Sequence, residues 1–171
     1  MGEGELQHPK YAGRLGTRAA LKMPYLERLT FIPRPRPEVF AFFADAHNLE
    51  RITPAFLRFH ILTPDPIEMR AGTLIDYEMR LYGMRVRWRT LIQRYEPDDF
   101  FVDVQLKGPY KSWRHRHEFK EVPGGTQMHD RVDYEMPYGM LGLLVRMLFV
   151  QGALKRIFDH RNTAIAEYFR S

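Results

Sequence analysis

The chain has 171 residues, of which 44% are hydrophobic and 13% aromatic, and its formal net charge is +5. This length suits a single domain with a hydrophobic core of its own. The chain contains no cysteine, so the sequence excludes disulfides, thiolate metal ligands and cysteine nucleophiles. The excess of basic residues permits an anionic partner but does not require one.

Residues 1–22 differ from the rest of the chain because they combine glycines and scattered charges without a sustained hydrophobic period. We interpret them as a flexible or loosely docked extension that precedes a domain at 24–171. The first residues, Met1-Gly2-Glu3, lack the basic region and apolar run of a signal peptide. The longest apolar run, 136–150, is shorter than the roughly 20 residues that cross a bilayer. We therefore expect a cytoplasmic protein.

Hydrophobic periodicity predicts the elements in chain order. Residues 25–32 alternate between apolar and polar side chains, which is typical of a strand, and the proline-rich segment 33–37 ends it. Two short helices follow, from 37 to about 47 and from 49 to 53. Further strands are predicted at 56–62, 72–81, 84–94, 100–106, 112–121 and 126–136.

Two strand pairs have side-chain patterns that agree in phase across their turns. In the hairpin 72–94, Tyr77 faces inward opposite Trp88, and Asp76 lies opposite Arg89 on the outer face. Strands 112–121 and 126–136 agree if Phe119 lies opposite Met128. In that register Trp113, His115 and His117 share one face with Tyr134, Val132 and Asp130.

The last predicted helix, 140–169, carries apolar residues three or four apart along one face. The complete order predicts an α+β fold, in which a curved antiparallel sheet of about seven strands wraps around this long C-terminal helix. The two short helices after the first strand close one end. A concave sheet and a long helix rarely pack flush along their whole length, so we expect a ligand cavity between them.

Several short motifs in this order resemble the START-like, or SRPBCC, helix-grip superfamily. They are residues 39–45, residues 48–54, Gly108-Pro109-Tyr110, Trp113-x-His115-x-His117-x-Phe119, Gly124-Gly125-Thr126 and Pro137-x-Gly139-x-Leu141-Gly142. The chain is most similar to bacterial ligand-binding members that are polyketide cyclase/dehydrase-like, and more distantly to coenzyme-Q-binding proteins. The resemblance implies a hydrophobic cavity for a lipid-, quinone- or polyketide-like ligand, with no obligatory cofactor. It supplies no catalytic set, because members of the superfamily differ in activity and many only bind.

The candidate site centres on two histidines of one strand, His115 and His117. Residues at i and i+2 of a strand point the same way, so both imidazoles should face the cavity. Asp130 on the neighbouring strand lies beside His117, where a carboxylate would hold the imidazole tautomer and favour its protonated form. The orientation of Asp103 stays open: Phe100, Val102, Val104 and Leu106 indicate that the other side of its strand faces the core. A three-residue turn at 108–110 would instead bring Asp103 opposite His115.

Three interpretations of this polar cluster compete. It is a hydrogen-bonded polar patch inside the sheet, a recognition site for the polar end of a ligand, or a general acid/base site that uses His115, His117 and Asp130. A metal site formed by the same three residues is conceivable, but we expect no metal and no cofactor. The residues predicted to bind the ligand are Tyr77, Met79, Trp88, Asp103, Trp113, His115, His117, Met128, Asp130 and Tyr134.

The sequence thus predicts intracellular binding or transport of a hydrophobic small molecule, rather than an enzyme. One alternative is a cyclase or dehydratase that uses the inward histidines. Another is association with nucleic acid or an anionic membrane through Arg85, Arg114, Arg116 and Arg131, although no specific nucleic-acid partner is expected. Peripheral membrane contact through Leu141, Leu144 and Phe149 is a further possibility.

Overall fold

The computed structural model describes residues 24–81, 83–137, 139 and 149–170. The predicted extension at 1–22 and the predicted helical residues 140–148, which include Leu141 and Leu144, lie outside the described residues. Phe149 is described, and its side chain is exposed.

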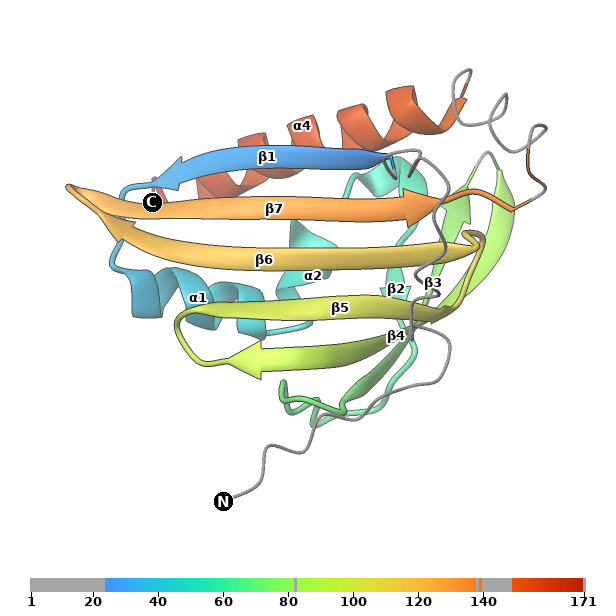
Figure 1. The fold of residues 1–171 in the computed structure, drawn as a ribbon, viewed down its shortest axis with the longest axis horizontal. Helices are drawn as coiled ribbons and strands as arrows, with labels where there is room; N and C mark the ends of the chain where they lie inside the picture. Colours follow the sequence, from blue (N-terminus) through green and yellow to red (C-terminus); the bar gives the residue numbers. More distant parts are fainter. Residues whose placement is uncertain (1–23, 82, 138, 140–148, 171) are drawn as a thin grey trace, which may run out of the picture.

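A single seven-stranded antiparallel sheet forms the body of the molecule, in the order β1-β7-β6-β5-β4-β3-β2 (Figure 1). Each consecutive pair from β3 to β7 is joined by a short connection, whereas β1 crosses over to pair with β7. The sheet confirms the predicted antiparallel architecture and strand number. The strands are β1 (Tyr25–Ile32), β2 (His60–Ile61), β3 (Leu74–Leu81), β4 (Met84–Glu96), β5 (Phe100–Lys107), β6 (Ser112–Val122) and β7 (Gly125–Glu135).

The helices lie together on one side of the sheet, behind it in Figure 1. The helix α1 (Arg36–Ala44) begins where the sequence predicts, because Pro37 occupies its first turn and Glu38 complements the positive end of the helix dipole. It is followed by α2 (Asn48–Arg51) and the 3₁₀ turn η2 (Ala55–Leu57). The last helix is α4 (Gln151–Tyr168).

The cross-strand registers agree with those predicted from the alternation of side chains. Tyr77 pairs with Trp88 and Asp76 pairs with Arg89 between β3 and β4. Between β6 and β7 the aligned residues are Trp113 and Tyr134, His115 and Val132, His117 and Asp130, and Phe119 and Met128.

The orientation of β5, which the sequence left open, is settled by its pairing with β6. Asp103 lies opposite His115, on the concave face. The alternate residues Phe100, Val102 and Val104 form a separate apolar cluster on the other face of the sheet. Both faces of β5 bear buried apolar side chains, so its sequence pattern alone could not show which face holds the aspartate.

The predicted strand at 56–62 is wrong over its first half. Residues 55–57 form η2 after Pro54, and Arg58 then adopts a left-handed backbone conformation with φ of 44°. Only His60 and Ile61 pair with β3. This segment is at the edge of the sheet, where a strand can bond to one neighbour only, so local turn geometry outweighs the apolar pattern.

The core lies between the concave face of the sheet and the helices. Toward one end, Ile165 of α4 packs with Phe40 of α1 and Phe119 of β6. Toward the other end, Leu154 and Phe158 of the same helix pack against tryptophans of β4 and β6. The helix therefore connects two apolar clusters along the sheet. No helix in the part of the chain that the structure describes is long and apolar enough to span a membrane.

Candidate functional site

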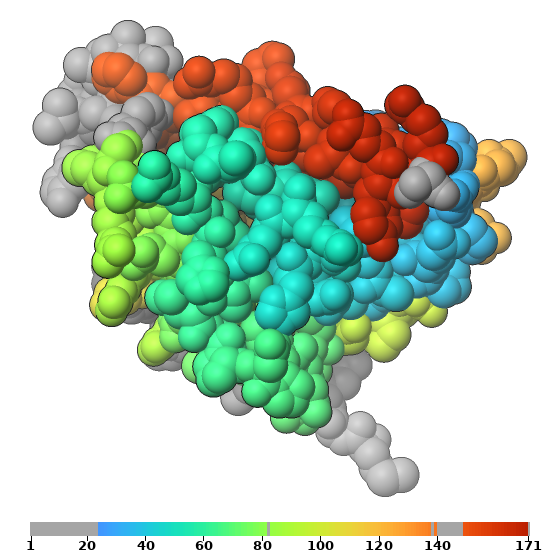
Figure 2. Space-filling view, turned by 180° about the vertical axis from the view of Figure 1, so that it is seen from behind, coloured from blue at the N-terminus to red at the C-terminus, as the bar shows by residue number. Residues whose placement is uncertain are grey.

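A cavity of about 170 Å³ lies between the two apolar clusters, bounded by the sheet on one side and by α4 and the α1–β3 segment on the other. One ordered water needs only roughly 10–15 Å³, so this space is larger than a hydration site. Its wall is mostly apolar and includes Leu57, Ile75, Trp88, Leu154 and Phe158. Figure 2 shows α4 in red and the segment between α1 and β3 in blue-green to green covering the concave side of the sheet.

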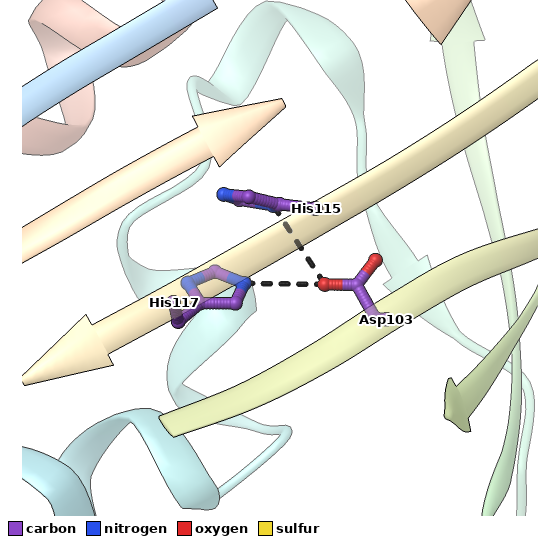
Figure 3. Close-up of side chains that lie close together, drawn as sticks. All are labelled: Asp103, His115 and His117. Carbon is purple, nitrogen blue, oxygen red and sulfur yellow. Dashed lines mark hydrogen bonds and ion pairs between the residues drawn. The ribbon is translucent and has the colours of Figure 1, made fainter. Parts of the chain in front are cut away.

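A cluster of polar residues in the wall comes from β5 and β6, backed by β7. Asp103 Oδ2 lies 3.1 Å from His117 Nε2 and 3.7 Å from His115 Nδ1. Figure 3 shows both rings turned toward this carboxylate. On the far side of the histidines, Asp130 Oδ1 lies 3.0 Å from His115 Nε2 and 2.8 Å from His117 Nδ1. We call these four residues the His/Asp cluster.

The two histidines of this cluster have different proton affinities. Burial lowers the pKa of His115, and the charge of His117, whose ring centroid is 3.7 Å away, acts in the same direction. Burial alone would also lower the pKa of His117, but the carboxylates of Asp103 and Asp130 raise it above its ordinary value. Of the two imidazoles, His117 therefore holds a proton more strongly.

Asp130 is the most deeply buried acid of the cluster, with 5% of its surface exposed. Burial favours its neutral form, but hydrogen bonding and charge from His115 and His117 hold the pKa of this carboxyl far below its usual range. Asp130 is accordingly a fixed negative charge that orients both imidazoles.

Further polar residues of the wall include Tyr77, Thr90 and Arg161. Tyr77 Oη lies 3.1 Å from Thr90 Oγ1, and burial raises the pKa of this tyrosine well above its usual value, so the hydroxyl stays protonated. Arg161 of α4 is part of the wall as well. Burial lowers the pKa of its guanidinium, and the negative charges of Asp130 and Asp103 oppose that shift.

Seven of the ten residues predicted to bind the ligand line the cavity, and three do not. The seven are Tyr77, Met79, Trp88, Asp103, Trp113, His115 and His117. Met128 is packed in the cluster around Phe119, Tyr134 is packed with Trp113, and Asp130 is screened from the cavity by the histidines. Facing inward was therefore not sufficient to place a residue on the cavity wall.

Arg161 was not predicted as a cavity residue, although its spacing along the helix indicates that it faces the sheet. It lies three residues after Phe158 and four before Ile165, both buried, so helical spacing places it on the covered face of α4. A charged residue on an otherwise apolar helix face is a candidate for a functional role.

The basic surface considered for anionic partners is largely neutralised by acidic neighbours. Of its four arginines, three pair with a carboxylate: Arg85 with Glu78 at 3.0 Å, Arg116 with Glu118 at 3.0 Å, and Arg131 with Asp133 at 3.2 Å. Arg116 also lies over the ring of Phe100. This arrangement gives no support to nucleic-acid binding.

Comparison with known proteins places the chain in a family. The model for the family described as polyketide cyclase / dehydrase and lipid transport matches residues 32–160. The chain belongs to this family. A search of curated proteins found no significant match.

Solved structures show the fold that this chain shares with other proteins. The Zhui aromatase/cyclase from Streptomyces sp. R1128 has a TM-score of 0.69 at 16% identity, over 86% of this chain and 94% of that one. The protein TTHA0849 from Thermus thermophilus has a TM-score of 0.68 at 18% identity, over 85% and 97% of the two chains. The architecture is thus the helix-grip fold that the sequence predicts.

A larger protein also contains a similar domain. The nucleoside-diphosphate sugar epimerase from Corynebacterium glutamicum has a TM-score of 0.62 at 26% identity. The match covers 83% of this chain but 28% of the epimerase. This chain is therefore similar to one part of that protein.

Proposed function

We propose that this family member binds a largely apolar small molecule in the cavity between the sheet and α4. The observation that carries the proposal is the composition of the cavity wall, where aromatic and aliphatic side chains surround a few polar groups. Such a wall excludes water from an apolar ligand and fixes the orientation of its polar end. The family description, which includes polyketide and lipid chemistry, supports the same class of ligand.

The polar groups in the wall favour a ligand with an acidic or strongly hydrogen-bonding end. Arg161 contributes donors that stay charged, and the nearby His/Asp cluster contributes imidazoles. A carboxylate that approaches Arg161 would form charge-assisted hydrogen bonds in a poorly solvated site, where such bonds are strong. We therefore assign the apolar tail to the tryptophan side of the cavity and the acidic end to Arg161.

Native mass spectrometry of the purified chain, followed by denaturing extraction, tests the proposal. The parent should carry a hydrophobic compound, whereas Met79→Trp, which fills the cavity, should be empty. Arg80→Trp is the matched control, since this neighbouring position is exposed on the opposite face of β3 and the variant should stay loaded. Equal loading of the parent and Met79→Trp, with both variants folded as judged by circular dichroism, would exclude the cavity as the site.

A second candidate function, a cyclase or dehydratase activity, is favoured by one observation. The imidazoles of His115 and His117 border the cavity and lie within reach of carboxylates, an arrangement that can move a proton on a bound molecule. Compounds extracted from the parent and from His117→Ala, expressed in the same host, separate the two functions. An enzyme should accumulate unconverted substrate in the variant, whereas a binding protein should yield the same compound from both.

A further inference from the structure

The His/Asp cluster has an arrangement that ligand binding does not require. Each histidine directs one ring nitrogen toward Asp130 and the other toward Asp103. Both contacts with Asp130 converge on Oδ1, at 3.0 Å from His115 Nε2 and 2.8 Å from His117 Nδ1. Both contacts with Asp103 converge on Oδ2, at 3.7 Å from His115 Nδ1 and 3.1 Å from His117 Nε2.

The hydrogen bonds of the cluster show which nitrogens are satisfied. His115 Nε2 is hydrogen-bonded to Asp130, which as a carboxylate only accepts, whereas His117 Nδ1 lies 2.8 Å from the same oxygen but is buried without a hydrogen-bond partner. When the nitrogens that face Asp130 carry the hydrogens, the opposite nitrogens, His115 Nδ1 and His117 Nε2, present lone pairs to the carboxylate of Asp103. Three electron-pair donors therefore face one another, which is unfavourable unless a proton or a cation lies among them.

We infer that Asp103, His115 and His117 form a binding site for a divalent transition-metal ion. Two imidazoles and one carboxylate are a ligand set typical of zinc or iron(II) with open coordination positions. The three donor atoms lie within 4.8 Å of one another. A tetrahedral ion with bonds of about 2.0–2.1 Å separates its ligands by roughly 3.3 Å, so small side-chain rotations would complete the site. This site goes beyond the proposed ligand binding and does not depend on it.

The surroundings of the three donors match what metal sites need. Asp130 accepts a hydrogen bond from His115 Nε2 and lies 2.8 Å from His117 Nδ1, and these are the nitrogens that would not bind the ion. An outer carboxylate in this position fixes the tautomer of metal-bound histidines. Asp103, His115 and His117 line the cavity, whereas Asp130 does not, so the open coordination positions would face the cavity.

The charges near the site are compatible with one divalent ion. Asp103 and Asp130 contribute two negative charges and Arg161 one positive charge, so a divalent ion would give a net charge of about +1 with neutral imidazoles. An anionic ligand or a hydroxide on the ion would bring the site to neutrality. In the competing state, a proton shared between His117 and Asp103 occupies the same space.

Metal binding is tested on the full chain after treatment with a chelator, with Co²⁺ alone as the probe. We expect one saturable site with visible absorption bands of a low-coordinate ion. His117→Ala and Asp103→Asn should each weaken binding at least about 100-fold, and Asp130→Asn roughly 10- to 100-fold, because it removes the outer carboxylate. His129→Ala is the matched control, since His129 also lies beside a carboxylate, Glu27 at 2.6 Å, and its removal should change nothing.

A second measurement does not depend on the folding of any variant. Nitrogen-15 spectra of the histidine rings, recorded while Zn²⁺ is added, should show zinc on His115 Nδ1 and His117 Nε2 and retained N–H groups on the nitrogens that face Asp130. Affinity that is unchanged in His117→Ala and Asp103→Asn, or zinc shifts confined to other histidines, would overturn the inference. So would the absence of Co²⁺ and Zn²⁺ binding by the parent, which would assign the cluster to a shared proton.

Discussion

Arg161 places a charged group in the wall of a mostly apolar cavity. It is half-buried on the covered face of α4 beside apolar residues, where partial removal of a cation from water is costly. Among the described residues its guanidinium has no ion pair within 4 Å; it lies over the ring of Phe158, 5.4 Å from the centroid, and the charges of Asp103 and Asp130 help to stabilise it. A cation kept in a mostly apolar cavity is explained if an acidic ligand completes its hydrogen bonds.

We predict that Arg161 makes the protein bind acidic ligands more tightly than neutral ones. A long-chain fatty acid should bind the parent more tightly than the alcohol of equal length, by roughly 10- to 100-fold, because a hydrogen bond to a charged group contributes about 1.5–3 kcal/mol. Arg161→Met should remove this preference while binding of the alcohol changes little. Arg156→Met, an exposed position on the same helix, is the control, and calorimetric titration measures both ligands. A preference that survives in Arg161→Met would contradict the assignment.

At the scale of the elements, an ion pair on the outer face of the β3–β4 hairpin contributes to stability. Arg89 Nε and Nη2 donate to the two carboxylate oxygens of Asp76 at 2.7 and 2.8 Å. The hydrogen bond from Arg89 holds the pKa of Asp76 below its usual value. Both side chains are more than one-third exposed, at 49% and 38%, so solvent screening limits the stabilisation to about 0.5 kcal/mol.

This pair predicts a pH-dependent stability difference between the parent and Asp76→Asn. Because the folded-state pKa is depressed, the stabilisation is present above the unfolded pKa of about 3.9 and is lost as the pH falls through the lower folded value. Urea unfolding near pH 7 should show the parent more stable, and the difference should be smaller near pH 3. Glu96→Gln, an exposed position on the neighbouring strand β4, provides the control. A difference that is equal at both pH values would show that the charge of Asp76 is not its source.

The start of β7 gives a second prediction at the element scale. A Cβ on Gly125 would collide with the backbone carbonyl oxygen of Ile32 at the end of β1. Gly125→Ala should therefore lower the free energy of unfolding by roughly 1–3 kcal/mol, since backbone must move to relieve the overlap. Gly152→Ala is the matched control, because nothing lies near that position in α4 and alanine favours helix; it should have no effect or stabilise slightly. Equal unfolding midpoints for the two variants would contradict the close approach.

At the scale of the whole molecule, the fold was more predictable than the cavity. Alternation of period two fixed the registers of both hairpins, because a slip by one residue would turn every apolar side chain outward. The cavity wall instead depends on which inward residues the helices leave uncovered. Met128 and Tyr134 face inward yet are covered, and Leu57 reaches the wall from a turn that the sequence predicted as a strand. Such placements depend on tertiary packing, which the local sequence pattern does not show.

Fluorescence quenching tests most directly whether an apolar ligand occupies this cavity. The chain has two tryptophans, Trp88 and Trp113, and both line the cavity. Bromine quenches indole only at short range, so a brominated fatty acid added to the lipid-free protein reports contact with the wall itself. We predict saturable quenching of both tryptophans that an unbrominated fatty acid reverses. A fatty acid that raises the melting temperature without quenching would place the ligand elsewhere and contradict the account.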